Sequence, residues 1–298
     1  MNVIECKDVT KNYKRKKALN SISFQIEENK ITGLVGRNGA GKTTLLKIIA
    51  GYMKEDSGEL QVFGESPFNN LMASANTIFI HDQMEFSPAL NLKEIFEAAE
   101  NFYEKWDRER SFRLLHYFSL DPKQYYKRLS KGMKSTFNMI FGLSANCTLT
   151  IFDEPTTGMD AAVRKDFYRA LLKDYLDNPR TIILSSHHLN EIEDLIEDLL
   201  LIKDGKELLY MPIADLKEWA IAVIGKSNVV NEWIGNKEMI HSKDMVQDQV
   251  YVVVRNDFSK VELEKAYKAG IKFSPVSSTD LCVYLTSKTK GGIDDVFS

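Results

Sequence analysis

A glycine-rich loop between two apolar segments is the feature that most limits what this chain can fold into. Residues 36–43 read GRNGAGKT and fit the pattern G-x-x-x-x-G-K-[ST] at every fixed position. Residues 31–35 before the loop are almost wholly apolar, as in a strand covered on both faces, and residues 42–50 after it carry leucine and isoleucine at helical spacing. This is the strand–loop–helix context that the pattern requires.

The residue types of the loop suit phosphate groups. Glycines let the backbone curl so that successive N–H groups point inward, and the following helix adds the positive end of its dipole. The lysine can reach the β- and γ-phosphates of a nucleoside triphosphate, and the first threonine can bind Mg²⁺. We therefore predict a nucleoside triphosphate site whose binding residues are Gly36, Arg37, Asn38, Gly39, Ala40, Gly41, Lys42, Thr43 and Thr44.

Two adjacent carboxylates end a second apolar segment. Residues 149–153 read LTIFD, and Glu154 follows. Because two acids at the end of a buried strand are costly without a cation or a proton to share, we expect Asp153 to face Mg²⁺. Glu154 is then free to polarise the attacking water as a general base. Thr150 interrupts the apolar run, a change that a sheet tolerates.

Strand-like and helical segments alternate over the first 217 residues. Residues 3–6 and 22–26 alternate with period two, as half-buried strands do. A helical, aromatic-rich region follows at about 84–145, where one helical stripe is expected to hold Ile95, Ala99, Phe102 and Trp106. The helical stretch 161–176 lies between two strand-like runs, which predicts a parallel unit with a right-handed crossover.

The pattern loosens after about residue 217. We expect a strand at 250–254, a short helix at 259–269 and another strand at 281–285. These segments predict a small C-terminal α+β domain at 218–298. We expect this domain to regulate the protein, to serve as a dimerisation module, or only to pack on the first domain.

Composition narrows the class of protein. The chain of 298 residues has a formal charge of −3, which supplies no general attraction to nucleic acid. No apolar run approaches the ~18 residues that span a bilayer, and the N-terminal segment lacks the apolar stretch of a secretory signal, so we expect a cytosolic chain. Cys6, Cys147 and Cys282 are far apart and odd in number, and we expect them to be buried as small hydrophobic residues.

Together these residues resemble the nucleotide-binding subunit of ATP-binding cassette (ABC) transporters, over residues 1 to about 217. The motifs occur in the family's order: residue 83 resembles the Q-loop, 129–133 the signature sequence, 153–154 the Walker B pair, 158–160 the D-loop and 185–187 the switch histidine. The resemblance implies that an aromatic ring stacks on adenine, that the glutamine contacts Mg²⁺ and water, and that the histidine holds the γ-phosphate. The residues that match these roles, with those of the signature and the D-loop, are Tyr13, Gln83, Ser130, Gly132, Asp160 and His187.

The signature departs from the commonest family form. Lys131 and Met133 stand where the family usually has glycine and glutamine, whereas Ser130 and Gly132 are retained. The retained pair supplies a small hydroxyl and a close-approaching backbone at the start of a helix. The positive charge of Lys131 either assists γ-phosphate binding or is simply solvated.

The resemblance also implies a fold and a mechanism. The fold is α/β, a P-loop NTPase cassette with a RecA-like core, an antiparallel β subdomain and a helical subdomain. Two cassettes sandwich two ATP molecules with Mg²⁺, so the chain is expected to pair with itself or with a paralogue. A separate transmembrane permease subunit would hold it at the cytoplasmic face of the cell membrane, and the aromatic-rich region after Gln83 is the expected docking surface.

The Lys-Gly-Met signature and the C-terminal extension resemble bacterial exporter ATPases for peptides and peptide antibiotics, of the bacitracin-resistance and phenol-soluble-modulin types. This favours export of an amphipathic or antimicrobial peptide. An importer ATPase shares every motif and remains an alternative. A third possible function is that of a soluble ABC ATPase that acts on DNA, ribosomes or assembly. The charge of −3 disfavours the members of that class that bind nucleic acid.

Overall fold

The computed structural model describes residues 1–14 and 16–287, and the chain divides into two compact units, Met1–Tyr210 and Met211–Ser298. The expected boundary at 217/218 lies inside helix α7 (Ile213–Trp219). The structure places α7 in the second unit because the helix packs on strand β10 (Ala220–Lys226) of that unit. The division therefore falls seven residues earlier than the sequence pattern indicates.

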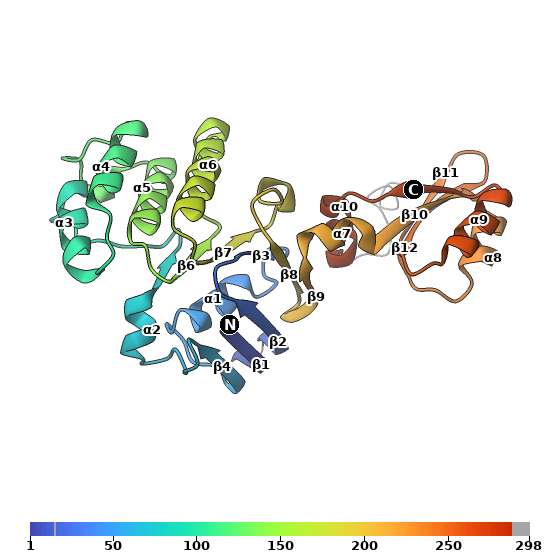
Figure 1. The fold of residues 1–298 in the computed structure, drawn as a ribbon, viewed down its shortest axis with the longest axis horizontal. Helices are drawn as coiled ribbons and strands as arrows, with labels where there is room; N and C mark the ends of the chain where they lie inside the picture. Colours follow the sequence, from blue (N-terminus) through green and yellow to red (C-terminus); the bar gives the residue numbers. More distant parts are fainter. Residues whose placement is uncertain (15, 288–298) are drawn as a thin grey trace. The chain divides into compact units, whose positions relative to one another are not determined.

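A six-stranded sheet forms the centre of the first unit (Figure 1). Its strands, in the spatial order β5-β6-β7-β3-β8-β9, are β5 (Thr77–Ile80), β6 (Leu149–Asp153), β7 (Thr181–Ser186), β3 (Ile31–Val35), β8 (Asp198–Lys203) and β9 (Lys206–Pro212). The strands from β5 to β8 pair in parallel. Every residue of β3, β6 and β7 is buried, which explains their continuous apolar runs. Parallel strands also bring the segments that follow them to one edge of the sheet.

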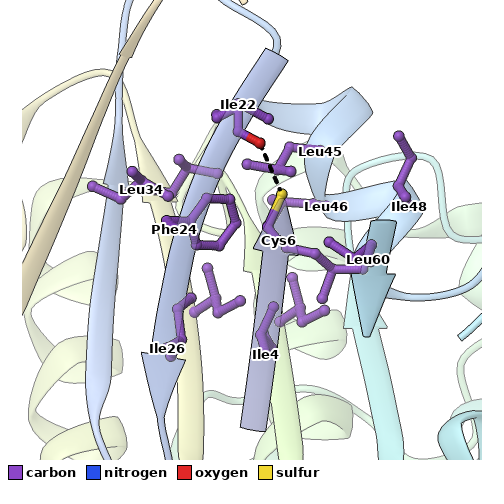
Figure 2. Packing of buried hydrophobic residues seen from close by; sticks show 14 of the residues in the cluster. Ile4, Cys6, Ile22, Phe24, Ile26, Leu34, Leu45, Leu46, Ile48 and Leu60 are labelled. Carbon is purple, nitrogen blue, oxygen red and sulfur yellow. Dashed lines mark hydrogen bonds between the residues drawn. The ribbon is translucent and has the colours of Figure 1, made fainter. Parts of the chain in front are cut away.

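An antiparallel sheet of three strands, β2-β1-β4, packs on helix α1 (Lys42–Ile49). The strands are β1 (Asn2–Tyr13), β2 (Lys16–Glu27) and β4 (Ser57–Val62). Figure 2 shows Ile4, Cys6 and Phe24 of the sheet together with Leu45 and Leu46 of α1 in this core.

The three cysteines are free and buried, which confirms their expected role as small hydrophobic residues. The Cys6 thiol donates a hydrogen bond to the Ile22 carbonyl oxygen over 3.3 Å (Figure 2). Burial raises the pKa of Cys6 to about 12, so this thiol stays protonated.

Helices fill the segment between β5 and β6. Helix α2 (Leu71–Asn76) precedes β5. Between β5 and β6 the chain forms α3 (Leu92–Phe102), α4 (Arg108–Tyr117), a 3₁₀ turn (Tyr126–Arg128) and α5 (Lys131–Ser144). Figure 1 shows α3, α4 and α5 gathered at one side of the sheet. The sequence pattern predicted one buried helical stripe from Ile95 to Trp106, and this prediction is wrong beyond Ala99. Helix α3 ends at Phe102, whose side chain is 69% exposed, and Asp107 then caps a new helix. Trp106 packs on Phe96 from the connection between the helices.

Helix α6 (Ala161–Asp177) joins β6 to β7, and a 3₁₀ turn (Leu189–Glu191) follows β7. The pairing of β6 with β7 is parallel, as the strand–helix–strand pattern predicts. The helix begins at the side chain of Asp160, which accepts a hydrogen bond from the Val163 N–H over 2.9 Å.

The second unit is a small α+β domain. Strands β11 (Met239–Met245), β12 (Gln249–Arg255), β10 and β13 (Lys272–Pro275) form an antiparallel sheet in this order, and residues of α8 (Ser227–Ile234) and α9 (Lys260–Lys268) share one apolar core with it. The strand expected at 281–285 is wrong. These residues belong to helix α10 (Ser278–Thr286), because the Ser277 side chain accepts from the Asp280 N–H and starts a helix there.

Within the described residues of both units, no helix is long and apolar enough to cross a membrane.

Candidate functional site

The glycine-rich loop connects the end of β3 to the start of α1, as the sequence pattern requires. Gly41 has a φ of +112°, a conformation that side chains disfavour, and this lets the loop turn directly into the helix. Lys42, the first residue of α1, is 6% exposed. Its Nζ donates to the Gly36 carbonyl oxygen over 2.7 Å, so the lysine ammonium is held inside the loop.

Asp153, at the end of β6, receives two hydroxyl hydrogen bonds. Thr43 Oγ1 donates to Asp153 Oδ2 over 2.7 Å, and Ser185 Oγ donates to Asp153 Oδ1 over 2.6 Å. A threonine hydroxyl beside a carboxylate is a donor set that Mg²⁺ uses together with phosphate oxygens and water. In the described part of the chain, no group of three or more His, Cys, Asp or Glu side chains can hold a metal by itself. The two residues therefore fit a magnesium ion that arrives with a phosphate substrate.

Glu154 lies between two basic groups. Its Oε1 is 3.0 Å from Lys42 Nζ, and its Oε2 is 2.8 Å from His187 Nδ1. The backbone of Glu154 has a φ of +47°, a strained conformation for a non-glycine residue, and its N–H donates to Ser185 Oγ over 2.9 Å. Strain of this kind persists where the surrounding structure determines the position of a side chain. The carboxylate of Glu154 is thus oriented from both of its oxygens and from its backbone.

A cavity of about 420 Å³ opens over the loop. Its lining residues come from the hairpin of β1 and β2, the loop, the start of α1 and the end of β6: Tyr13, Lys16, Ala18, Asn38, Gly39, Gly41, Lys42, Thr43, Thr44 and Glu154. Tyr13 is 44% exposed, and its hydroxyl donates to Met53 Sδ over 3.1 Å. An exposed ring at the wall of this cavity can stack on a base, and the backbone N–H groups of a glycine-rich loop can bind phosphates.

Some residues of the predicted site lie apart from this cavity. Arg37 is exposed and Ala40 is buried, and neither lines it. Gln83 is exposed as well, and its N–H donates to His81 Nδ1 over 3.2 Å. Burial and the nearby Lys47 lower the pKa of His81, which keeps this nitrogen available as an acceptor.

The signature and D-loop residues form a second group, which does not line the cavity either. Ser130 caps α5 and accepts from the Met133 N–H over 3.3 Å, so the substituted signature keeps the helix start that the serine provides. A Cβ atom on Gly132 would lie 2.6 Å from the Gly158 carbonyl oxygen, so only glycine allows the signature and the D-loop to approach this closely. Asp160 directly follows that contact as the cap of α6.

Sequence reasoning missed Lys16, Ala18 and Ser185. Lys16 faces the cavity because the hairpin register pairs it with Tyr13, and Ser185 reaches Asp153 because strand pairing sets the two residues side by side. The switch-histidine segment 185–187 contains Ser185, but no motif gives this serine or Lys16 a role. Both are placed by strand register, which a single sequence does not display.

Comparison with known proteins agrees with the geometry. The family model described as ABC transporter matches residues 19–157. The SkfA peptide export ATP-binding protein SkfE of Bacillus subtilis is 30% identical over 241 residues, which are 78% of this chain and 99% of that protein. The bacitracin transport ATP-binding protein BcrA of Bacillus licheniformis is 30% identical over 219 residues, 72% of each chain.

Import proteins are also similar. The arabinose import ATP-binding protein AraG of Ralstonia nicotianae is 28% identical over 78% of this chain and 46% of its own length. Among solved structures, the dimeric post-hydrolysis state of the ATP-binding cassette MJ0796 with ADP and Pi has a TM-score of 0.62 over 70% of this chain and 98% of that one, at 22% identity. That likeness shows the P-loop cassette fold. The chain belongs to the ABC transporter family, as an ATP-binding and ATP-hydrolysing subunit of a transporter.

Proposed function

We propose that this ATPase subunit powers the export of an amphipathic or antimicrobial peptide through a separate transmembrane subunit, at the cytoplasmic face of the cell membrane. The observation that carries the ATPase half is the contact of Glu154 with both Lys42 and His187, beside the Thr43–Asp153 pair. The peptide half is supported by relatives that are named for peptide export and bacitracin transport.

The residues of the site divide the work of hydrolysis. The loop N–H groups and Lys42 bind the phosphates, and the ammonium that now contacts Glu154 turns to the more highly charged phosphate oxygens. This frees Glu154 Oε1 to accept a proton from the attacking water, while His187 keeps the other carboxylate oxygen in place. Thr43 and Asp153 would hold Mg²⁺, which would supply positive charge to neutralise the phosphates.

The second group of residues needs a partner. Ser130, Gly132 and Asp160 do not line the cavity over the phosphate loop of their own chain. We propose that they contact the nucleotide held by a second cassette, either another copy of this chain or a paralogue. The known dimer of a cassette with the same fold supports this arrangement.

Lys16 is proposed to add a second positive charge for the nucleotide. Its side chain is exposed at the cavity wall, and its Nζ lies 3.8 Å from the position of a Cβ built on Gly39 of the loop. For Lys16→Ala we expect ATP to bind about fivefold more weakly at low salt, because an exposed ionic contact contributes roughly 1 kcal/mol. Calorimetric titration with ATP at two salt concentrations measures the effect. Lys17→Ala is the matched control, since Lys17 bonds Asn20 instead, and an equal loss in both variants would contradict the assignment.

The docking surface for the membrane subunit is proposed to include an exposed apolar patch, defined by Tyr52, Phe68, Leu71 and Met72. On α2, Leu71 is 88% exposed and Met72 is 69% exposed. Neighbouring large apolar side chains that are exposed to water often mark a site of contact with another protein. Tyr52 packs edge-on against Phe79, which in turn contacts the His81 ring two residues before Gln83. Tyr52 of the patch is thus linked to the segment that leads into Gln83, through which nucleotide binding can be communicated to a partner.

A transport assay tests the proposal. The chain is co-purified with a candidate membrane subunit and reconstituted into vesicles with the ATPase on the outside. An exporter accumulates labelled peptide inside these vesicles when ATP is added, and peptide raises the ATPase rate. Loss of preloaded substrate instead would identify an importer, the second candidate, which the similarity to the arabinose import protein favours. If the vesicles moved substrate in neither direction and the membrane subunit did not change the ATPase rate, both candidates would be contradicted.

A further inference from the structure

A buried carboxylate that does not line the nucleotide cavity joins its own helix, α6, to four other elements of the first unit. Asp174 lies in the last turn of α6 and is 6% exposed. It forms ion pairs with two arginines, Arg110 of α4 and Arg180, which immediately precedes β7. Arg180 is itself 5% exposed. The mechanism proposed above uses none of these three charges.

Each arginine also donates a hydrogen bond to a residue in or next to another element. Arg110 Nη1 donates to Asn146 Oδ1 over 3.2 Å, and Asn146 follows the end of α5. Arg180 Nε donates to Thr150 Oγ1 over 3.2 Å, and Thr150 is the second residue of β6. The network therefore explains why a threonine interrupts the apolar sequence of this strand: its hydroxyl is the partner of a buried guanidinium.

Four of these elements, α5, α6, β6 and β7, carry residues of the proposed mechanism at their opposite ends. Helix α5 begins at Ser130 and is about 20 Å long. Strand β6 ends at Asp153 and Glu154, and β7 leads into His187. Helix α6 begins at Asp160. A shift where these elements meet at Asp174 would thus move the signature relative to the residues that hydrolyse ATP.

We propose that Asp174 is a positioning residue for hydrolysis, which sets the signature helix α5 against strands β6 and β7 through Arg110 and Arg180. The inference rests on the proposed function, in which Ser130 acts on the nucleotide of a second cassette. Apolar side chains of similar volume stabilise a core as well as buried ions do, so stability alone does not call for charges here. Two guanidinium groups on one carboxylate define a single geometry, because each presents its donors in a rigid plane.

Asp174→Asn keeps the size of the side chain and removes its charge. We expect kcat for ATP hydrolysis to fall about tenfold, while the ATP affinity of the isolated chain changes less than twofold, because the phosphate loop lies outside the network. In a Glu154→Gln background, the ATP concentration needed for dimerisation should rise about tenfold. Asp166→Asn is the matched control: Asp166 also joins α6 to α4, through the Tyr117 hydroxyl over 2.8 Å, but at the surface. This control should leave all three measurements unchanged.

The outcomes separate the possible failures. If Glu154→Gln alone forms no ATP-dependent dimer, with itself or with a paralogue, the proposed function fails and this inference with it. If that variant dimerises, the double variant with Asp174→Asn dimerises equally well, and the single variant Asp174→Asn keeps its kcat, only the positioning role is wrong. A parallel loss of ATP affinity and kcat would show a merely structural role and would overturn it too.

A second variant covers the case in which Asp174→Asn does not fold. Thr150→Val keeps the shape of a β-branched residue and both ion pairs of Asp174, but it removes the hydroxyl that Arg180 Nε contacts. We expect kcat to fall about threefold at unchanged ATP affinity. An unchanged kcat in this variant would contradict the link from Asp174 to β6.

Discussion

Glu154→Gln is expected to lower kcat for ATP hydrolysis by about 10²–10⁴-fold while ATP still binds, because an amide has nearly the shape of the carboxylate but accepts no proton from water. The side chain contacts Lys42 through Oε1, and we expect phosphate to replace this contact when ATP binds. Steady-state phosphate release and calorimetric ATP titration on the same preparation measure the two effects. Glu59→Gln, an exposed change on β4, is the control.

The same variant reports on the assembly. With hydrolysis blocked, ATP should hold two cassettes together, so size-exclusion chromatography with ATP and Mg²⁺ should show a dimer that ADP does not support. The experiment is run with this chain alone and with a candidate paralogue. A kcat close to that of the unchanged protein would refute the role of Glu154 as the general base.

Lys42→Ala is expected to weaken ATP binding by about 10–100-fold, since hydrogen bonds to a charged group contribute about 1.5–3 kcal/mol. The buried ammonium is held by Gly36 inside the loop, so it is already placed for phosphate before ATP binds. Hydrolysis at moderate ATP concentration should fall with binding, and saturating ATP should recover only part of it. Filter binding with radiolabelled ATP measures the affinity.

Lys47→Ala provides the comparison for this variant, because Lys47 stands in the last turn of the same helix and does not line the cavity. It should bind ATP normally. If Lys42→Ala kept full affinity, or if Glu154→Gln lost affinity as strongly as Lys42→Ala, the division of binding and hydrolysis between the two residues would be wrong.

Functional residues could be predicted from the sequence where they all lie in one short segment. The loop at 36–43 needs glycines and a helix start within eight residues, and the carboxylates at 153–154 need only the strand before them. Burial on both faces of β3, β6 and β7 left continuous apolar runs, so the parallel sheet was also predictable. The resemblance in motif order extended these segments to a cassette, which the comparisons confirm.

Short segments without a strong period were predicted less well. Residues 281–285 form a short apolar run like that of a strand, but the cap at Ser277 makes them part of a helix. Trp106 continues a helical stripe in sequence, but α3 ends before it. In both places the capping side chain and the packing partners outweigh local periodicity.

By itself, the sequence predicted a site that binds and hydrolyses a nucleoside triphosphate, because the groups proposed to touch phosphate and water lie in contiguous motifs, and the family resemblance specified ATP. Only the tertiary structure decided which distant residues support them. Lys16 reaches the nucleotide cavity through a hairpin register, Ser185 orients Asp153 across two strands, and Asp174 joins four elements through two arginines. These contacts depend on strand pairing and helix packing between segments that are far apart in the chain, so no local pattern contains them.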